Sequence, residues 1–404
     1  MKNNLVKSVL LKKGLVKNIL LKQVLLKTVL PAMVLLFAVI SAVCPVGCKS
    51  RIEEINVLEG DFTVPHIENF AVTGGRTLQL DFTKKVSVQN VNTYESESKK
   101  DFSSASARYE EDGKRVILEL AEKPETGSGY VLESLVVDES GNSLTLSIPF
   151  KGYNDNPAKV ILSEVRNAYG IATVKDEDGN SVKVHRSEFA ELYVLKSGNL
   201  CGIEVCSAAD GESKKYTMPA IEVKKGDYIT VHMRTIAADG ADGQGMISET
   251  GSNLALSTHE DSCDTARDLW SENTKACFAD SDIIYLKNSY NQKIMDALVY
   301  ARSDLAAWKD GFKDVVKAVE ESGVWGQSVS PEDGLCSDYV TSATTRSFSR
   351  QNIKQCIKAY ENGMPVPGGK EVWLLTADSG RGKNKVAGVT PGYKNSSNAY
   401  TPKK

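Results

Sequence analysis

The stretch YVLESLVVDESGNSLTLSIPF, residues 130–150, decides the fold class. Its second half, SLTLSIPF (143–150), alternates polar and apolar residues, which is the period of a β-strand with one buried face. DESGN (138–142) supplies the Asp, Gly and Asn that turns favour, so we expect a hairpin with YVLESLVV (130–137) as its first strand. Asp138 and Asn142 could also suggest calcium, but their spacing favours a turn closed by the Asp side chain.

Alternation continues on the N-terminal side of this hairpin. In RTLQLDF (76–82) the apolar residues fall on one face, and RVILELA (115–121) repeats the pattern. Short strands at intervals of about ten residues, separated by Gly, Asp and Asn, predict a β-sandwich. TLQLDFTKKV and GYVLESLVVDESGNSL resemble bacterial Ig-like domains of surface proteins, and the resemblance covers residues 62–152.

A second β-rich region follows the linker GYNDNPAK (152–159). Its pieces resemble the lamin-tail domain, an Ig-like sandwich, over residues 158–395. The matching pieces, in chain order, are VILSEV (160–165), EFAELYVL (188–195), KKGDYITVHM (224–233), SDIIYLKNSYNQKIMDALVY (281–300), TTRSFSR (344–350) and VTPGYKN (389–395). Asp282 and Asp296 stand where the resemblance expects acids in the paired late strands.

Two helical patterns interrupt this second region. Apolar residues from Leu305 to Val319 recur at spacings of three and four, with Ser303 as the candidate N-cap, and a shorter pattern surrounds Cys356 and Ile357. We therefore expect a mainly β protein with two Ig-like β-sandwich domains, the second carrying a helical insertion at about 303–363. Residues 396–404 are expected to be a tail.

The N-terminus has the pattern of an export signal. Residues 1–47 carry seven lysines and no acid, and the uncharged run 28–43 is short for a membrane span of about 20 residues. We expect a signal peptide over 1–47, with an uncleaved anchor as the alternative. Gly47-Cys48 resembles the end of a bacterial lipobox, which implies lipidation of Cys48 and a tether over 48–61. Pro45 and Val46 depart from the strict lipobox pattern.

The six cysteines that follow Cys48 favour disulfides if the chain is exported, because that compartment permits them. Fifteen pairings are possible, and local pairing joins Cys263 to Cys277 and Cys336 to Cys356. Cys201 and Cys206 would then pair across a bulge or bend, since five residues of continuous strand place them on opposite faces. We expect no structural zinc site, because no Cys-x-x-Cys occurs and the chain has four histidines.

Charge and motifs narrow the function. The formal charge of −3 becomes −10 for residues 48–404, which argues against nucleic acid as a partner. STHEDSCDTARD (257–268) offers His259, Glu260 and Asp261 as candidate metal ligands, but solvated acids are normal in such a loop, so we predict no metal and no cofactor. No Gly-x-Ser-x-Gly elbow occurs, and SGRGKNK (379–385) lacks the full phosphate-loop pattern.

These observations lead to one expectation and two alternatives. We expect a non-enzymatic, lipid-anchored envelope protein facing the periplasm or the cell surface, whose lamin-tail-like domain binds a protein or glycan ligand through loops and sheet edges. An envelope hydrolase of the phosphoesterase or nuclease type would require His259, Glu260 and Asp261 to converge with other acids in a cleft. A polysaccharide-binding protein would show an exposed aromatic row, for which Trp270, Trp325 and Trp373 are the candidates.

Overall fold

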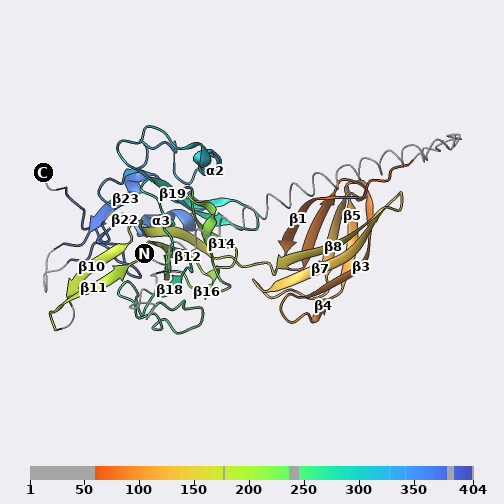
Figure 1. Ribbon diagram of the computed structural model, residues 1–404, viewed down its shortest axis with the longest axis horizontal. Helices are drawn as coiled ribbons and strands as arrows, with labels where there is room; N and C mark the ends of the chain where they lie inside the picture. The colour runs from red at the N-terminus through yellow and green to blue at the C-terminus, as the bar shows by residue number, and fades with distance from the viewer. Residues whose placement is uncertain are drawn as a thin grey trace, which may run out of the picture. The chain divides into compact units, whose positions relative to one another are not determined.

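The structure is a computed structural model that describes residues 60–175, 178–235, 245–326, 328–341, 343–379 and 386–402. The expected signal peptide, Cys48 and most of the tether lie outside these residues, as does most of SGRGKNK. The described residues form a mainly β protein with two separate large apolar cores (Figure 1). Within them, no helix is long and apolar enough to cross a membrane.

The first core lies between two four-stranded sheets. Their orders are β1-β2-β6-β5 and β4-β3-β7-β8, and every pairing in them is antiparallel. The strands are β1 (Ile67–Gly74), β2 (Thr77–Phe82), β3 (Val86–Glu95), β4 (Asp101–Ser103), β5 (Ala105–Glu110), β6 (Arg115–Leu120), β7 (Gly129–Asp138) and β8 (Ser143–Lys151), with a 3-10 turn at Glu111–Gly113. This arrangement confirms the expected sandwich of short strands.

The alternating residues bury the faces that the sequence predicts. Leu78, Leu80 and Phe82 of β2 are buried against β7 and β8 residues in this core. The turn after β7 is also as expected: Asp138 Oδ1 accepts the backbone N–H groups of Ser140 at 3.0 Å and Asn142 at 2.8 Å. The hydrogen bond from the Asn142 side-chain amide lowers the pKa of Asp138 most, and the backbone bonds add to this against the opposing effect of burial.

The second and larger core lies between a six-stranded and a five-stranded sheet. Their orders are β18-β17-β12-β9-β22-β23 and β15-β14-β19-β20-β21. The strands are β9 (Lys159–Arg166), β12 (Phe189–Lys196), β14 (Ile203–Ser207), β15 (Gly211–Thr217), β17 (Tyr228–His232), β18 (Arg267–Trp270), β19 (Asp282–Asn288), β20 (Ile294–Ala301), β21 (Leu335–Cys336), β22 (Arg346–Arg350) and β23 (Trp373–Ala377). Two pairings, β17 with β18 and β20 with β21, are parallel.

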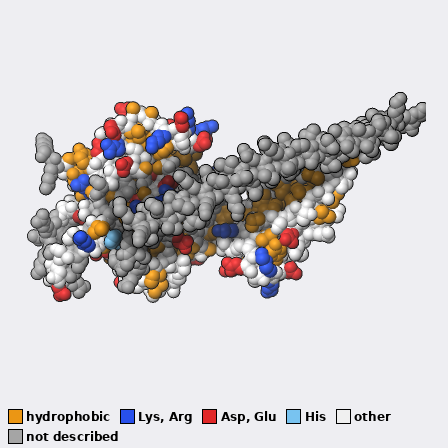
Figure 2. All heavy atoms as spheres, viewed as in Figure 1, with side chains coloured by type: hydrophobic (Ala, Val, Ile, Leu, Met, Phe, Trp, Pro, Cys, Tyr) orange, Lys and Arg blue, Asp and Glu red, His pale blue; other side chains and the backbone are white. Residues whose placement is uncertain are grey.

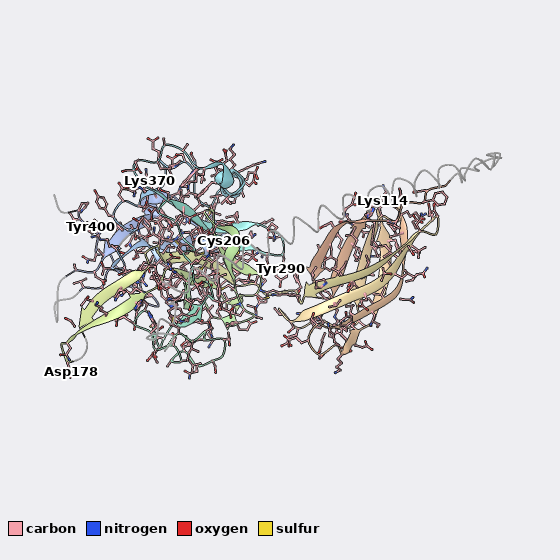
Figure 3. All side chains as sticks on the ribbon, viewed as in Figure 1. Lys114, Asp178, Cys206, Tyr290, Lys370 and Tyr400 are labelled. Carbon is pink, nitrogen blue, oxygen red and sulfur yellow. The ribbon has the colours of Figure 1, made fainter. Side chains whose placement is uncertain are left out.

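Two small sheets complete the β-structure. The strands β13 (Gly198–Asn199) and β16 (Glu222–Val223) form a short ladder. The strands β10 (Gly170–Lys175) and β11 (Ser181–Arg186) form a hairpin that is a sheet of its own and extends from the larger body in Figure 1. Asp178 lies at its tip (Figure 3).

The helical region differs from the expectation. The first helix does not begin near Ser303: a 3-10 turn at Asp310–Phe312 precedes α2 (Lys313–Ser322), and Ser303 donates its N–H to Asp338 at 3.0 Å instead of capping. The second helix, α3 (Ile353–Glu361), is present, and a 3-10 turn at Lys370–Val372 precedes β23. Between the helices lie β21 and β22, so the segment 303–363 also supplies strands to both large sheets.

Both faces of the six-stranded sheet are covered. Leu162, Leu192 and Val231 point into the large core, whereas Ile161, Tyr193 and Leu195 pack with Cys356 of α3 on the opposite face. The rest of that opposite face carries polar side chains that are buried all the same. Because buried polar groups need partners, the segment covering them must supply hydrogen bonds. That segment comes from the C-terminal region.

Candidate binding groove and the carboxylates behind its wall

A groove of about 900 Å³ opens where the edges of the two large sheets meet. Leu335 and Cys336 of β21 line it from the five-stranded sheet, and Leu375 of β23 lines it from the six-stranded sheet. Residues of the loops 302–306 and 331–334, with Tyr400 and Pro402, complete its lining. The volume lies in the range of roughly 300–1,000 Å³ that is usual for ligand sites.

The groove combines apolar and polar side chains. Leu305, Leu335 and Leu375 supply apolar surface, and Arg302 and Lys370 carry positive charge. Lys370 Nζ donates to the carbonyl oxygen of Glu332 at 3.2 Å. Figure 3 shows Lys370 and Tyr400 on the same side of the larger body. The face drawn in Figure 2 mixes charged and hydrophobic side chains.

Tyr400 is held in the groove wall from two sides. Its backbone N–H donates to Leu375 O at 2.8 Å, and the adjacent Ala399 bridges Thr376 of β23. The guanidinium of Arg346 lies 3.9 Å from the centre of its ring, and the Tyr339 ring lies 5.6 Å away. Such cation–π contacts contribute about 0.5–1 kcal/mol at exposed sites. The expected tail, 396–404, is therefore in part an extension of the six-stranded sheet.

Residues 389–402, which we call the C-terminal strap, lead to Tyr400 across the polar face of this sheet. The backbone N–H of Thr390 donates to Glu164 Oε1 at 3.1 Å and the Thr390 hydroxyl to Oε2 at 2.8 Å. The N–H of Gly392 donates to Glu191 Oε2 at 2.6 Å. Asn395 Nδ2 donates to the carbonyl oxygens of Ser163 and Arg350, both at 2.8 Å.

The two glutamates that receive the strap are fully buried and face each other. Glu164 of β9 and Glu191 of β12 are paired residues of adjacent antiparallel strands, so their side chains share one face. Burial raises the pKa of Glu164 to about 7, although Ser347 and Thr390 oppose the rise by donating hydrogen bonds. Burial and the neighbouring Glu164 raise the pKa of Glu191 well above its ordinary value.

An ion pair fixes the neighbouring strands below the strap. Arg350 Nη2 of β22 donates to both carboxylate oxygens of Asp296 in β20, at 2.8 and 2.7 Å. Asp296 Oδ2 also accepts the N–H of Leu162 at 2.7 Å, and Arg350 Nε donates to Leu162 O at 2.8 Å. Asp296 and Arg350, which lie in two separate pieces of the resemblance, are therefore direct partners that join the two sheets.

Asp282, the other acid expected in the late strands, has a structural position too. It accepts the Ser207 hydroxyl at 2.6 Å and the backbone N–H groups of Ala279, Ala209 and Ile283. Burial raises its pKa to about 7 against these hydrogen bonds, which favour the charged form. Asp282 therefore holds the loops at the ends of β14 and β19.

The candidate metal ligands do not converge with other acids. Arg166 donates to both oxygens of buried Asp261, and Arg186 lies near both Asp261 and Glu260. Burial opposes ionisation of Asp261, but the charge of Arg166 keeps its pKa well below the usual range. His259 Nε2 lies 2.9 Å from His185 O, and burial lowers the His259 pKa to about 4.

The described residues contain no group of three His, Cys, Asp or Glu side chains placed to hold a metal ion. A hydrolase site would require His259, Glu260 and Asp261 to lie with other acids in a cleft. Instead, Glu260 and Asp261 form ion pairs with arginines. A histidine–carboxylate contact does occur nearby, where His232 Nε2 lies 2.9 Å from Asp268 Oδ1. His232 is buried and stacks on Trp270 at 3.7 Å.

The three tryptophans do not form an exposed row. Trp270 is 8 % exposed, Trp325 is 3 % exposed and Trp373 is 5 % exposed, and Trp270 Nε1 donates to Ser257 Oγ at 3.2 Å. Trp325 and Trp373 belong to the large apolar core. These tryptophans therefore serve packing, and the aromatic residues of the groove are the exposed Tyr339 and the half-buried Tyr400.

The six described cysteines form no disulfide, so the three expected pairs are absent from this structure. The surroundings of each pair differ. Cys336 is exposed on β21, whereas Cys356 is buried in α3. Cys263 Sγ lies 3.1 Å from Thr265 Oγ1, and Cys277 Sγ donates to Lys214 O at 3.4 Å. Cys201 contacts Tyr290 at 3.4 Å, while Cys206 points into the large core from β14.

Several side chains of the candidate site were not predicted from the sequence. Glu164 and Glu191 sit inside VILSEV and EFAELYVL, and an acid within such an apolar strand is the signal that could have found them. Arg302, Lys370 and Tyr400 come from three distant segments, and only the meeting of two sheet edges brings them together. No local sequence pattern indicates that these two sheet edges meet.

Comparison with known proteins identifies a family and a relative of this chain. Residues 158–375 match the model of the family TP_1001_2nd, described as a protein second domain. An uncharacterized protein of Treponema pallidum (strain Nichols) is 32 % identical over 180 residues. This match covers 44 % of the chain and 41 % of the relative, so the chain spans about two fifths of that protein's length.

Solved structures show only distant likeness. The N-terminal part of the bacterial S-layer protein SbsC is 18 % identical, covering 40 % of this chain and 38 % of that one, with a TM-score of 0.22. A DUF4876 family protein from Bacteroides thetaiotaomicron VPI-5482 is 10 % identical, covering 67 % of this chain and 84 % of that one, with a TM-score of 0.23.

Proposed function

Since residues 158–375 make this chain a member of the TP_1001_2nd family, a protein second domain, we propose that this region is the binding head of a lipid-anchored, non-enzymatic cell-envelope protein. The observation that carries the proposal is the groove between β21 and β23. Cys48 would supply the lipid anchor after removal of residues 1–47, and the sandwich over 67–151 would act as a stalk.

The groove favours an extended protein segment as the ligand. β21 is the outermost strand of its sheet, and its backbone is paired on one side with β20. An extended peptide can add to such an edge through main-chain hydrogen bonds while alternate side chains enter pockets. Leu305, Leu335 and Leu375 would receive apolar side chains. Arg302 and Lys370 would meet polar or acidic groups at the rim.

A glycan is the second candidate, and one observation favours it. Tyr339 is 42 % exposed and stands beside Tyr400 in the groove lining. Exposed tyrosines present a flat apolar ring with a polar tip, which suits a sugar face as well as a peptide. Enzymatic treatment of the target distinguishes the two ligands. Protease treatment would abolish binding to a peptide, and glycosidase treatment would abolish binding to a glycan.

The proposal is tested by blocking the groove. Purified protein would be titrated onto isolated envelopes of the producing cell, before and after protease or glycosidase treatment. Ala306→Trp places a large ring on an exposed groove position and should weaken binding at least tenfold. Ile171→Ala changes a 56 % exposed isoleucine of β10 that does not line the groove, and should bind as the unaltered protein does. Equal binding by both variants would contradict the proposal.

A further inference from the structure

The C-terminal strap connects two parts of the fold that differ in chemistry. Near its start, Thr390 and Gly392 donate to the buried carboxylates Glu164 and Glu191. At its end, Tyr400 and Pro402 form part of the groove lining. Release of the strap over its whole length would therefore expose the carboxylates and also remove a piece of the groove wall.

Among the residues that the structure describes, the two carboxylates lack a cation for each charge. Arg166, two residues after Glu164 in β9, is the nearby guanidinium, but its donors go to Asp261 and to the carbonyl oxygen of Ser187. Placing two facing carboxylates away from water is costly when both are ionised, and a shared proton removes one charge. The pair must then be treated as one unit that binds protons.

Hydrogen bonding shows where a proton fits. Glu164 accepts from the Ser347 hydroxyl and from two groups of Thr390, so both of its oxygens are occupied by donors. Glu191 Oε2 accepts the Gly392 N–H, whereas Glu191 Oε1 is buried and accepts no hydrogen bond of good geometry. The Ser163 hydroxyl also lies beside Glu191, but it donates to Asn395 Oδ1 at 3.0 Å. Protonation of Glu191 Oε1 therefore keeps every hydrogen bond that the two carboxylates accept.

The other groups around the pair do not replace that proton. Tyr228 of β17 and Cys263 of the loop before β18 are the titratable neighbours on that side. Asp268 of β18 shares the sheet but bonds to His232. Ser347 and Ser349 of β22 and Thr376 of β23 bring hydroxyls that also contact one another, and the strap brings N–H groups and one hydroxyl.

We propose that seating of the C-terminal strap is coupled to proton uptake by the Glu164–Glu191 pair, so that the groove wall is more completely formed at mildly acidic pH than at alkaline pH. When the strap leaves, water reaches both carboxylates, and they release the proton that burial required. When the strap returns, the pair takes a proton up. The coupling concerns the strap itself and is independent of which ligand the groove binds.

The direction follows from linkage. The pKa of both glutamates is raised in the seated state, and strap release returns them toward the ordinary value near 4.5. Seating therefore binds protons, and it is favoured below the ordinary pKa and disfavoured as the pH rises through the seated-state pKa. One linked proton changes the seating equilibrium by up to about tenfold for each pH unit in that window.

Hydrogen–deuterium exchange of the peptide covering 386–402 tests the coupling without any ligand. After correction for intrinsic exchange rates, protection in the unaltered protein should fall by at least tenfold between pH 5.5 and pH 8, while β6 remains protected. Glu191→Gln keeps an acceptor for Gly392 and needs no proton, so its pH dependence should be several-fold smaller. Thr390→Val removes a strap hydroxyl but keeps both carboxyls, so it should lower protection at both pH values and retain the pH dependence.

Two results would overturn the coupling. The first is strap protection in the unaltered protein that does not change between the two pH values, which needs no variant to interpret. The second is a Glu191→Gln protein whose strap retains the full pH dependence.

Discussion

Glu164 and Glu191 stand directly opposite each other on β9 and β12, buried beneath the C-terminal strap that both of them hold. This placement makes folding as a whole sensitive to pH. The raised pKa of Glu164, about 7, means that the native state binds more protons than the unfolded state between about 4.5 and 7. The free energy of unfolding should therefore decrease as the pH rises through that window.

Glu191→Gln should stabilise the protein at pH 8, where the unaltered pair bears its largest penalty. We expect a gain of about 1–3 kcal/mol at pH 8 and a smaller one at pH 5, because a tenfold difference in proton affinity between the folded and unfolded states corresponds to about 1.4 kcal/mol. Urea denaturation at the two pH values measures the gain. An equal effect at both pH values would rule out the proton linkage as its cause.

The Asp296–Arg350 pair joins the two large sheets, and removing one partner leaves a buried charge. Asp296→Asn and Arg350→Met should each lower the free energy of unfolding by about 3–5 kcal/mol. The double variant should lose clearly less than the sum, because neither charge then remains unpaired. Denaturation of the four proteins in a double-mutant cycle measures the coupling. Additive losses would show that the two side chains do not stabilise each other.

Replacing Gly392 should destabilise the protein for two reasons, a positive φ and a lack of space. A second glycine with a similar φ but open space separates the two effects. The φ of Gly392 is 79°, and a Cβ there would lie 2.5 Å from the Cβ of Cys263. Gly141 has a similar φ of 85° with nothing within 4 Å of an added Cβ. Gly141→Ala should cost about 1 kcal/mol from backbone strain alone, and Gly392→Ala clearly more. Thermal denaturation compares the two, and equal losses would mean that the strap does not pack tightly on Cys263.

The lipid anchor is tested independently of the groove. Cys48→Ala should abolish incorporation of labelled fatty acid and move the protein from the membrane to the soluble fraction. Cys44→Ala, four residues earlier, should leave both properties unchanged. Labelled, membrane-bound protein after Cys48→Ala would exclude Cys48 as the lipidated residue.

Periodicity predicted the strands well because burial of one face is a local property. Leu78, Leu80 and Phe82 alternate with polar residues, and their strand lies where the alternation places it. β3, β4 and β5 were missed because their segments carry few buried apolar residues. The prediction started the helix at Ser303, about ten residues before α2 begins. Ser303 has the residue type of an N-cap, but the sequence does not show that it donates its N–H to Asp338 instead.

The site was harder to predict because it depends on contacts distant in sequence. Thr390 reaches Glu164 across more than two hundred residues, and Tyr400 completes a groove begun by β21. Cysteine spacing also failed as a guide to pairing, since parity and proximity in sequence do not tell which thiols share a face. His259 and Asp261 are close in sequence, but Asp261 pairs with arginines from β9 and β11, whereas His259 contacts the carbonyl oxygen of His185.

Site-specific photo-cross-linking in intact cells tests the central claim most directly. A photoreactive residue at Tyr339, in the groove, should yield one predominant adduct to a protein segment, identified by mass spectrometry and lost when Ala306→Trp is added. The same residue at Tyr109, which is 43 % exposed on the first sandwich, serves as the control and should not give that adduct. Identical adducts at the two positions, or a Tyr339 adduct that survives Ala306→Trp, would contradict the groove as the binding site.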